Sequence, residues 1–143
     1  MLSASIPKLL ERRTVLSGSM QAVEEFCVDL RRRSDGLLDR ASGFAIELLT
    51  REALTNAVVH GCQEDTKRQI RCAWRLSGRG FLLCVDDGGE GFDWRAAWNR
   101  QAGSGEASGR GVEILRKYAS RVRYNDKGNV LIIFRRHEEG RHP

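Results

Sequence analysis

Apolar and polar positions follow two different periods along this chain, and each period indicates a type of secondary structure. Within residues 17–33 the apolar positions recur at helical spacing, and they are Met20, Val23, Phe26, Cys27 and Leu30. A polar stretch with a glycine, residues 31–36, ends this amphipathic helix. A second helix is predicted from about residue 40 to His60, and Gly61 follows it in the position of a C-terminal cap.

Alternation with a period of two predicts short strands. We expect them at residues 8–16, 68–77, 80–86, 121–126 and 130–136. The turn SGRG joins the second strand to the third, and the turn KGN joins the last two strands in a hairpin. A helix is predicted over residues 111–122, and residues 137–143 are expected to form a disordered tail.

Residues 93–108, DWRAAWNRQAGSGEAS, fit neither period and end in small residues. Loops of this length are uncommon in a compact domain, and those that occur are usually functional. We therefore interpret this stretch as a lid or a binding loop.

Three polar residues lie four positions apart inside the second predicted helix, namely Glu52, Asn56 and His60. At about 100° per residue they fall within roughly one quarter of the helix circumference. The same side of the helix carries mostly apolar residues, which are Ala45, Leu48, Leu49, Ala53, Ala57 and Val59. We therefore expect the polar stripe to face the core. A buried carboxylate needs partners, so the stripe belongs either to an internal hydrogen-bond network or to a site for a ligand that enters the fold.

The composition fits one domain of ordinary size. The chain has 143 residues, of which 41% are hydrophobic, and this is enough for a single domain over residues 1–143 with a sizeable core. The net charge of +5 is spread over several short basic runs without interleaved aromatic residues. We therefore expect no direct contact with nucleic acid.

The cysteines and the distribution of apolar residues indicate the cellular compartment of the protein. The four cysteines, Cys27, Cys62, Cys72 and Cys84, form no C-x-x-C pair and no zinc-like spacing with the histidines. Isolated cysteines of this kind are usually small buried residues of a reduced protein. The N-terminus lacks the apolar region of a secretory signal, and no apolar run approaches the roughly 20 residues that span a bilayer. We therefore expect a cytoplasmic protein without membrane contact.

Two glycine-rich stretches carry candidate ligand-binding chemistry. In CVDDGGEGFD, residues 84–93, a predicted strand ends at two aspartates and three glycines follow within four positions. Glycine lets the backbone approach a ligand closely, and an aspartate such as Asp87 can accept a hydrogen bond from a ligand amine. A plain Asp-Gly turn is the alternative interpretation.

The second stretch, GSGEASGRGVEIL, spans residues 103–115 and places four glycines immediately before the predicted helix. Such a loop presents free backbone N–H groups and the positive end of the helix dipole, which suits a phosphate group. A flexible linker is the alternative. Neither a P-loop motif nor a Rossmann motif is present in the sequence.

The order of these stretches resembles the GHKL, or Bergerat-fold, ATPase superfamily. Its three motifs are matched, in chain order, by Glu52 and Asn56, by Asp87, Gly89 and Gly91, and by Gly109 and Gly111. The resemblance covers about residues 8–136. It implies an α+β fold, a two-layer sandwich in which about three helices cover one face of a mixed, mostly antiparallel sheet. It also implies that residues 93–108 form a flexible ATP lid.

The resemblance further implies ATP and Mg²⁺ as cofactors and gives each motif a role. Asp87 would bind the adenine amino group, Asn56 would bind Mg²⁺, and Glu52 would be the catalytic general base. The glycine loop that contains Gly109 and Gly111 would bind the phosphates.

Three more positions are assigned to the cofactor site. His60 is given a supporting role, hydrogen bonding to a phosphate or to the lid, with a structural histidine as the alternative. Arg110 is the nearest cation to the Gly-x-Gly motif. Many family members have a threonine after the glycine of the final hairpin, where it supports the adenine-binding aspartate, whereas this chain has Asn129. Because asparagine can donate the same kind of hydrogen bond, we expect the pocket to be retained.

Within the superfamily, the stretches TREALTNAVVHG, GFD and SGRGVEIL are most similar to anti-sigma-factor serine/threonine kinases of the RsbW and SpoIIAB type. The resemblance implies a homodimeric kinase of a partner-switching system, which sequesters a sigma factor and phosphorylates a STAS-domain anti-anti-sigma factor. Two alternatives stay open: a kinase that switches another enzyme such as a phosphatase, and a nucleotide-gated module without phosphotransfer. We expect neither a sensor histidine kinase, which needs a helical hairpin upstream of the Glu52 helix, nor a gyrase-type ATPase, which needs a following transducer domain.

Overall fold

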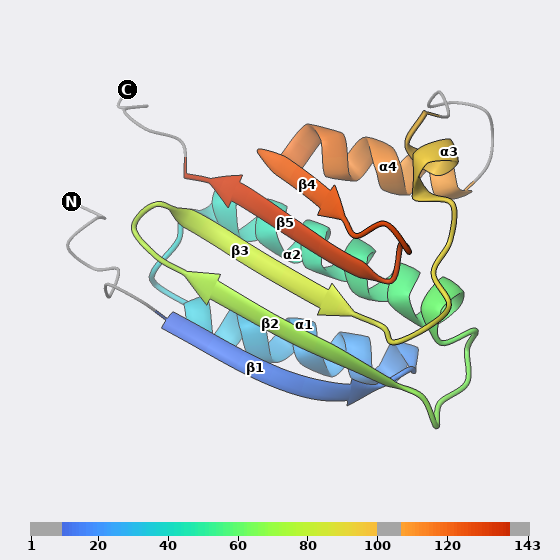
Figure 1. Cartoon of the computed structure of the whole chain (residues 1–143). Helices are drawn as coiled ribbons and strands as arrows, with labels where there is room; N and C mark the ends of the chain where they lie inside the picture. The colour runs from blue at the N-terminus through green and yellow to red at the C-terminus, as the bar shows by residue number, and fades with distance from the viewer. Residues whose placement is uncertain (1–9, 100–106, 138–143) are drawn as a thin grey trace.

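The computed structural model describes residues 10–99 and 107–137, which form a five-stranded sheet with helices packed on one face (Figure 1). The elements in chain order are β1 (Leu10–Ser17), α1 (Met20–Ser34), α2 (Arg40–Asn56), η2 (Ala57–Gly61), β2 (Gln69–Leu76), β3 (Gly80–Asp86), α3 (Trp94–Asn99), α4 (Ala107–Tyr118), β4 (Arg121–Tyr124) and β5 (Val130–Arg136).

The strand order across the sheet is β1-β2-β3-β5-β4. Neighbouring strands are antiparallel in all four pairings, so the described sheet is antiparallel throughout rather than mixed. Figure 1 shows α1, α2 and α4 behind this sheet and α3 beside the end of α4. The predicted two-layer α+β fold is therefore confirmed.

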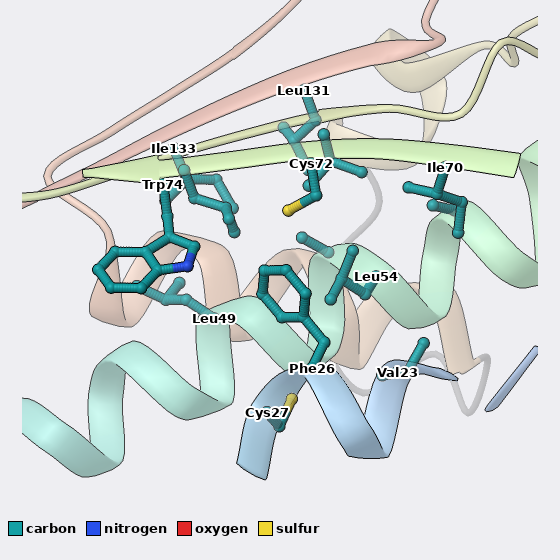
Figure 2. Close-up of a cluster of buried hydrophobic side chains, with 14 of the residues drawn as sticks. Val23, Phe26, Cys27, Leu49, Leu54, Ile70, Cys72, Trp74, Leu131 and Ile133 are labelled. Atoms are coloured by element: carbon teal, nitrogen blue, oxygen red, sulfur yellow. The ribbon is translucent and has the colours of Figure 1, made fainter. Parts of the chain in front are cut away.

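The core lies between the sheet and the helices. In β2 the buried residues are Ile70, Cys72, Trp74 and Leu76, and they alternate with residues that point to the other face of the sheet. Figure 2 shows the first three of these side chains facing Val23, Phe26 and Cys27 of α1 and Leu49 and Leu54 of α2. The period-two pattern of the strands thus buries one face of the sheet against the apolar stripes of the helices.

Side-chain caps fix where the two long helices begin. The hydroxyl oxygen of Ser19 accepts a hydrogen bond from the backbone N–H of Ala22 (3.1 Å), and a carboxylate oxygen of Asp39 accepts one from Ser42 (2.6 Å). These bonds satisfy backbone donors at the N-termini of α1 and α2, and the bond from Ser42 lowers the pKa of Asp39. An exposed ion pair from Arg31 to Glu47 (2.7 Å) then joins the two helices.

The predicted orientation of α2 is correct only in part, since Ala45, Leu49 and Ala53 are buried as expected but burial extends to the opposite side of the helix. Its buried face includes Thr50 and Leu54, both fully buried, whereas Val59 is 41% exposed. The stripe of Glu52, Asn56 and His60 therefore lies at the margin of the buried face rather than at its centre. The helix is rotated from the predicted orientation because α1 and α4 both pack against it, which buries more than one side. Thr50 fits this core because its hydroxyl donates to the carbonyl of Ile46 (2.8 Å).

Several predicted boundaries also differ from the structure. The second helix changes to a π-helical turn after Asn56 and reaches Gly61 in this form. The predicted lid contains a short helix, α3, while residues 100–106 lie outside the described residues. Helix α4 begins at Ala107, so Gly109 and Gly111 lie within its first turns rather than before it.

The predicted tail begins one residue too early. His137 is hydrogen-bonded to the β2–β3 turn, through its backbone N–H to the carbonyl of Arg79 (3.0 Å) and through Nε2 to that of Ser77 (2.9 Å). Residues 138–143, the rest of that prediction, lie outside the described residues.

Candidate functional site

The predicted site residues converge where α2 and η2 end beside the ends of β3 and β5. Asn56, His60, Asp87 and Asn129 line one small cavity, although they come from four different segments of the chain. Glu52 lies one helical turn before Asn56 on α2. The structure therefore brings together polar residues that the sequence places up to 77 positions apart.

Glu52 is in direct contact with Gly111 of α4. A Cβ at Gly111 would overlap the carboxylate oxygen Oε1 of Glu52 and would lie 3.0 Å from its Cδ. Only a glycine allows this approach. The backbone of α4 at Gly111 therefore lies directly against the Glu52 carboxylate. Burial raises the pKa of Glu52, and hydrogen bonding to the Asn56 side chain acts in the opposite direction.

Asp87 is enclosed by two glycines. A Cβ at Gly61 would overlap the Asp87 carboxylate, and the backbone N–H of Gly89 donates to Oδ1 of Asp87 (2.7 Å). Burial is the largest influence on this carboxyl and raises its pKa, while the bond from Gly89 lowers it. Gly61, which the sequence indicated only as a helix cap, is thus part of the site.

Gly91 allows the loop after β3 to cross the β4–β5 hairpin. Its φ is +86°, and a Cβ there would overlap the carbonyl oxygen of Lys127. Gly128 has a φ of +82°, and a Cβ there would overlap the carbonyl oxygen of Phe92. These two glycines bring the loop and the hairpin together, and the hairpin in turn presents Asn129 to the site.

Asn129 supports the Asp87 loop through hydrogen bonds to its backbone. Its side-chain amide donates to the carbonyl of Gly89 (2.9 Å), and its backbone carbonyl accepts from the N–H of Asp87 (3.1 Å). These two bonds hold the backbone at Asp87 and at Gly89. Asn125 holds Asn129 in place by donating its own amide to Oδ1 of Asn129 (2.6 Å).

His60 stacks on an aromatic cluster that the sequence did not reveal. Its ring lies 5.8 Å from that of Phe92, and Phe92 meets Tyr124 edge-on at 5.5 Å. Trp94 stacks on the other side of Tyr124 at 5.4 Å. Burial, with smaller contributions from Glu52 and Asp87, raises the pKa of Tyr124 to about 12. We call Phe92, Trp94 and Tyr124 the aromatic cluster.

Gly109 and Arg110 belong to helix α4, but their side chains lie outside the described part of the structure. Their predicted contacts with phosphate and the role of Arg110 remain predictions. Gly111, two residues further along the helix, is the member of the Gly-x-Gly motif that the structure places against Glu52.

The donor set of this site suits a nucleotide better than a bare metal ion. Asp87 and the amides of Asn56 and Asn129 line one cavity. One helical turn before Asn56, the partly buried carboxylate of Glu52 contacts Gly111 of α4. Among the described residues, no group of three or more His, Cys, Asp or Glu side chains could hold a metal ion. Mg²⁺ in nucleotide sites is held largely by substrate phosphates and water, with only one or two protein ligands.

Comparison with known families decides the identity of this arrangement. The family model of the histidine kinase-like ATPase domain matches residues 16–135 of the chain. The chain belongs to the histidine kinase-like ATPase domain family. The matched range contains all the predicted site residues, and domains of this family bind ATP, typically with Mg²⁺. The GHKL resemblance is thereby confirmed at the level of the superfamily.

A search of curated proteins gave no match to this histidine kinase-like ATPase domain. Within the described residues, none of the helices combines the length and the apolar character needed to cross a membrane.

Proposed function

We propose that this histidine kinase-like ATPase domain is a serine/threonine protein kinase of a bacterial partner-switching system. The observation that carries the proposal is the contact between Glu52 and Gly111, with Asn56 beside it. It sets a partly buried carboxylate against the backbone of the Gly-x-Gly helix. A carboxylate at this place can accept a proton from an attacking hydroxyl while the backbone contacts a phosphate.

The resemblance assigns the roles of the residues, and their surroundings are compatible with these roles. Asp87 accepts a hydrogen bond from the adenine amino group, because its Oδ1 already bonds Gly89 and Oδ2 is available. Asn56 provides a side-chain oxygen for Mg²⁺. Glu52, whose pKa burial raises, takes the proton of the substrate hydroxyl. Bound ATP and Mg²⁺ would supply the phosphoryl group and offset the charge on its oxygens.

The partners follow from the resemblance to anti-sigma-factor kinases. The proposed substrate is a STAS-domain anti-anti-sigma factor, and the proposed second partner is a sigma factor held by a homodimer of the kinase. A phosphate on the STAS protein adds about two negative charges to the interface, and like-charge repulsion with desolvation then releases it. The lid around α3 would respond to the nucleotide state and so select the partner.

Labelled ATP tests this proposal. Wild-type protein, Glu52→Gln and the control Glu47→Gln are incubated with γ-labelled ATP, Mg²⁺ and a lysate of the source cells. Glu47 is a suitable control because it lies on the same helix but pairs with Arg31 at the surface. We expect label on a serine or threonine of a small STAS-domain protein with wild type and Glu47→Gln, and none with Glu52→Gln.

Other outcomes separate the alternatives. Label on a different protein, such as a phosphatase, would support the kinase activity but contradict the STAS-domain protein as its substrate. ATP binding without any label would contradict the kinase and support a nucleotide-gated binding module. Equal amounts of label with wild type and with Glu52→Gln would show that Glu52 is not the general base.

A further inference from the structure

The outer face of the sheet carries an ordered pattern of side chains. We use this name for the side turned away from α1, α2 and α4, which pack on the other side (Figure 1). Because neighbouring strands are paired in register, the side chains of the outer face lie in rows that cross the sheet. One row consists, from β1 to β4, of Arg13, Ala73, Cys84, Ile132 and Arg123. The row is apolar at its centre and basic at both ends.

The neighbouring row has a similar order. It consists of Glu11, Arg75, Leu82, Phe134 and Arg121. In both rows the residues of β3 and β5 are apolar, and charged residues lie on both sides of them. Strands lie about 4.8 Å apart, so this apolar strip is about 10 Å wide, which is close to the diameter of an α-helix.

Two grooves run along the outer face. They have volumes of about 550 and 650 Å³, and Leu82 lines both of them. Ile132, in the apolar strip, is 38% exposed, although isoleucine is among the residues most often buried. Exposed apolar side chains that lie together in a groove mark an interaction site.

The charge of the outer face is strongly positive. The arginines that line the two grooves are Arg13, Arg71, Arg75, Arg121, Arg123 and Arg136, and the carboxylates are Glu11 and Asp86. Arg75 pairs with Glu11 (3.5 Å), whereas the other five arginines have no ion-pair partner within residues 10–99 and 107–137. A surface of this kind attracts a partner with an excess of Asp and Glu.

We propose that the outer face binds an acidic amphipathic helix of a partner protein. The apolar side of this helix lies along the strip of β3 and β5, and its Asp and Glu residues meet the arginines on both sides of the strip. Recognition of this type uses apolar anchors at positions i, i+3, i+4 and i+7 of the bound helix. Strand β3 has seven residues, and a strand of that length spans about 23 Å, so a helix of about 15 residues covers it.

The inference goes beyond the proposed kinase and does not depend on nucleotide. Glu52 and Gly111 belong to α2 and α4, and the sheet separates these helices from the outer face. The protein can therefore hold ATP in its helical layer while a partner occupies the other side of the sheet.

The pattern favours an acidic protein helix over two other occupants. A second copy of this chain would bring the same arginines against one another, and like charges at an interface are unfavourable. A nucleic acid would meet the carboxylates of Glu11 and Asp86. Single-stranded nucleic acids also need aromatic rings for stacking, and Phe134 is the only aromatic residue turned to the outer face in the described strands.

The test uses the full chain and a fluorescently labelled synthetic peptide of about 15 residues, with leucines at helical spacing and glutamates on both flanks. One control peptide has the same composition in an order without an apolar stripe, and a second has lysine in place of glutamate. Fluorescence anisotropy gives the dissociation constants, and NMR shifts of backbone amides locate the bound peptide. We expect the acidic amphipathic peptide to bind at least about tenfold more tightly than either control and to shift amides of β3 and β5.

Charge reversal at the two ends of one row tests the surface itself. The variants are Arg13→Glu and Arg123→Glu, both at exposed positions, and the matched control is Arg32→Glu, an exposed arginine of α1. We expect each outer-face variant to weaken peptide binding at least about fivefold, while Arg32→Glu leaves it unchanged. Circular dichroism checks that all three variants are folded, and all three should bind ATP as wild type does.

Each other outcome overturns the inference. Equal binding of the three peptides, equal binding by wild type and both outer-face variants, or amide shifts confined to the helices would show that the outer face is not the docking site. A dimer that Arg123→Glu dissociates in sedimentation experiments would assign the face to a second copy. Tighter binding to a single-stranded oligonucleotide or to phosphatidylglycerol vesicles than to the peptide would assign it to those ligands. Failure of wild type to bind ATP would contradict the kinase alone.

Discussion

The backbone of Gly111 lies directly against the carboxylate of Glu52, closely enough that a Cβ at Gly111 would overlap Oε1. This contact joins the first and last motifs of the site, which are 59 positions apart in the sequence. Since the carboxylate and the helix backbone share one small space, a change in either residue must move the other. The relationship leads to the first prediction.

Gly111→Ala should lower the rate of phosphotransfer about 10- to 100-fold. The added methyl group displaces Glu52, and a displacement of about 1 Å at a catalytic group can cost this much. The matched control is Gly43→Ala in α2, where a Cβ meets nothing within 4 Å. This control should retain full activity and gain about 0.5–1 kcal/mol in the free energy of unfolding, because alanine is the better helix former. Full activity in Gly111→Ala would contradict the role of the contact.

Gly61→Ala should weaken ATP binding at least about tenfold, which corresponds to about 1.4 kcal/mol of binding free energy. Its Cβ would overlap the Asp87 carboxylate and turn it away from the adenine position. Overpacking should also lower the free energy of unfolding by about 1–3 kcal/mol, so circular dichroism must show that the variant is folded. Gly78→Ala is the control, since the space around Gly78 is open. Calorimetric titration with ATP measures the dissociation constants of both variants. Equal values for Gly61→Ala and Gly78→Ala would contradict the prediction.

Asn125→Ala should lower the free energy of unfolding by about 1–2 kcal/mol. Its Oδ1 accepts from the backbone N–H groups of Gly128 (2.8 Å), Asn129 (3.0 Å) and Val130 (3.1 Å), and so fixes the hairpin that presents Asn129. Asn125→Asp keeps these acceptor bonds and loses only the amide that donates to Asn129. Urea unfolding should therefore rank the aspartate variant between wild type and the alanine variant. The opposite order would show that the donated bond is the more important one.

The sequence was sufficient for the strands, the long helices and the motifs, though not for α3, because these depend on local patterns. The alternation of β2 and the capping residues of α1 and α2 each act over a few positions. The rotation of α2 was not predictable in this way, since it depends on α1 and α4 packing against two of its sides. Thr50 illustrates this, because it is polar in sequence but fully buried in the fold.

The aromatic cluster was missed for a similar reason. Phe92 and Trp94 lie in a stretch without periodicity, and Tyr124 comes from a strand 30 positions further along the chain. Gly61 was recognised only as a helix cap, because its contact with Asp87 exists only once the end of η2 lies against the end of β3. Contacts of this kind join separate segments, and a single sequence carries no local signal for them.

Glu52→Gln should make the protein more stable at neutral pH, and the gain should disappear as the pH falls. Burial raises the pKa of Glu52 in the folded state, so below the ordinary carboxyl pKa the group is protonated in both states and costs nothing. As the pH rises through the raised pKa, the folded state must hold a buried charge and loses stability, whereas glutamine stays neutral. Glu47→Gln should behave in the opposite way, since hydrogen bonding to Arg31 lowers the pKa of Glu47. Its loss of stability should be present at neutral pH and should vanish as the pH falls through that lowered pKa. Urea unfolding from about pH 2 to pH 8 measures both differences. A difference for Glu52→Gln that stays constant with pH would show that this carboxylate is not held buried.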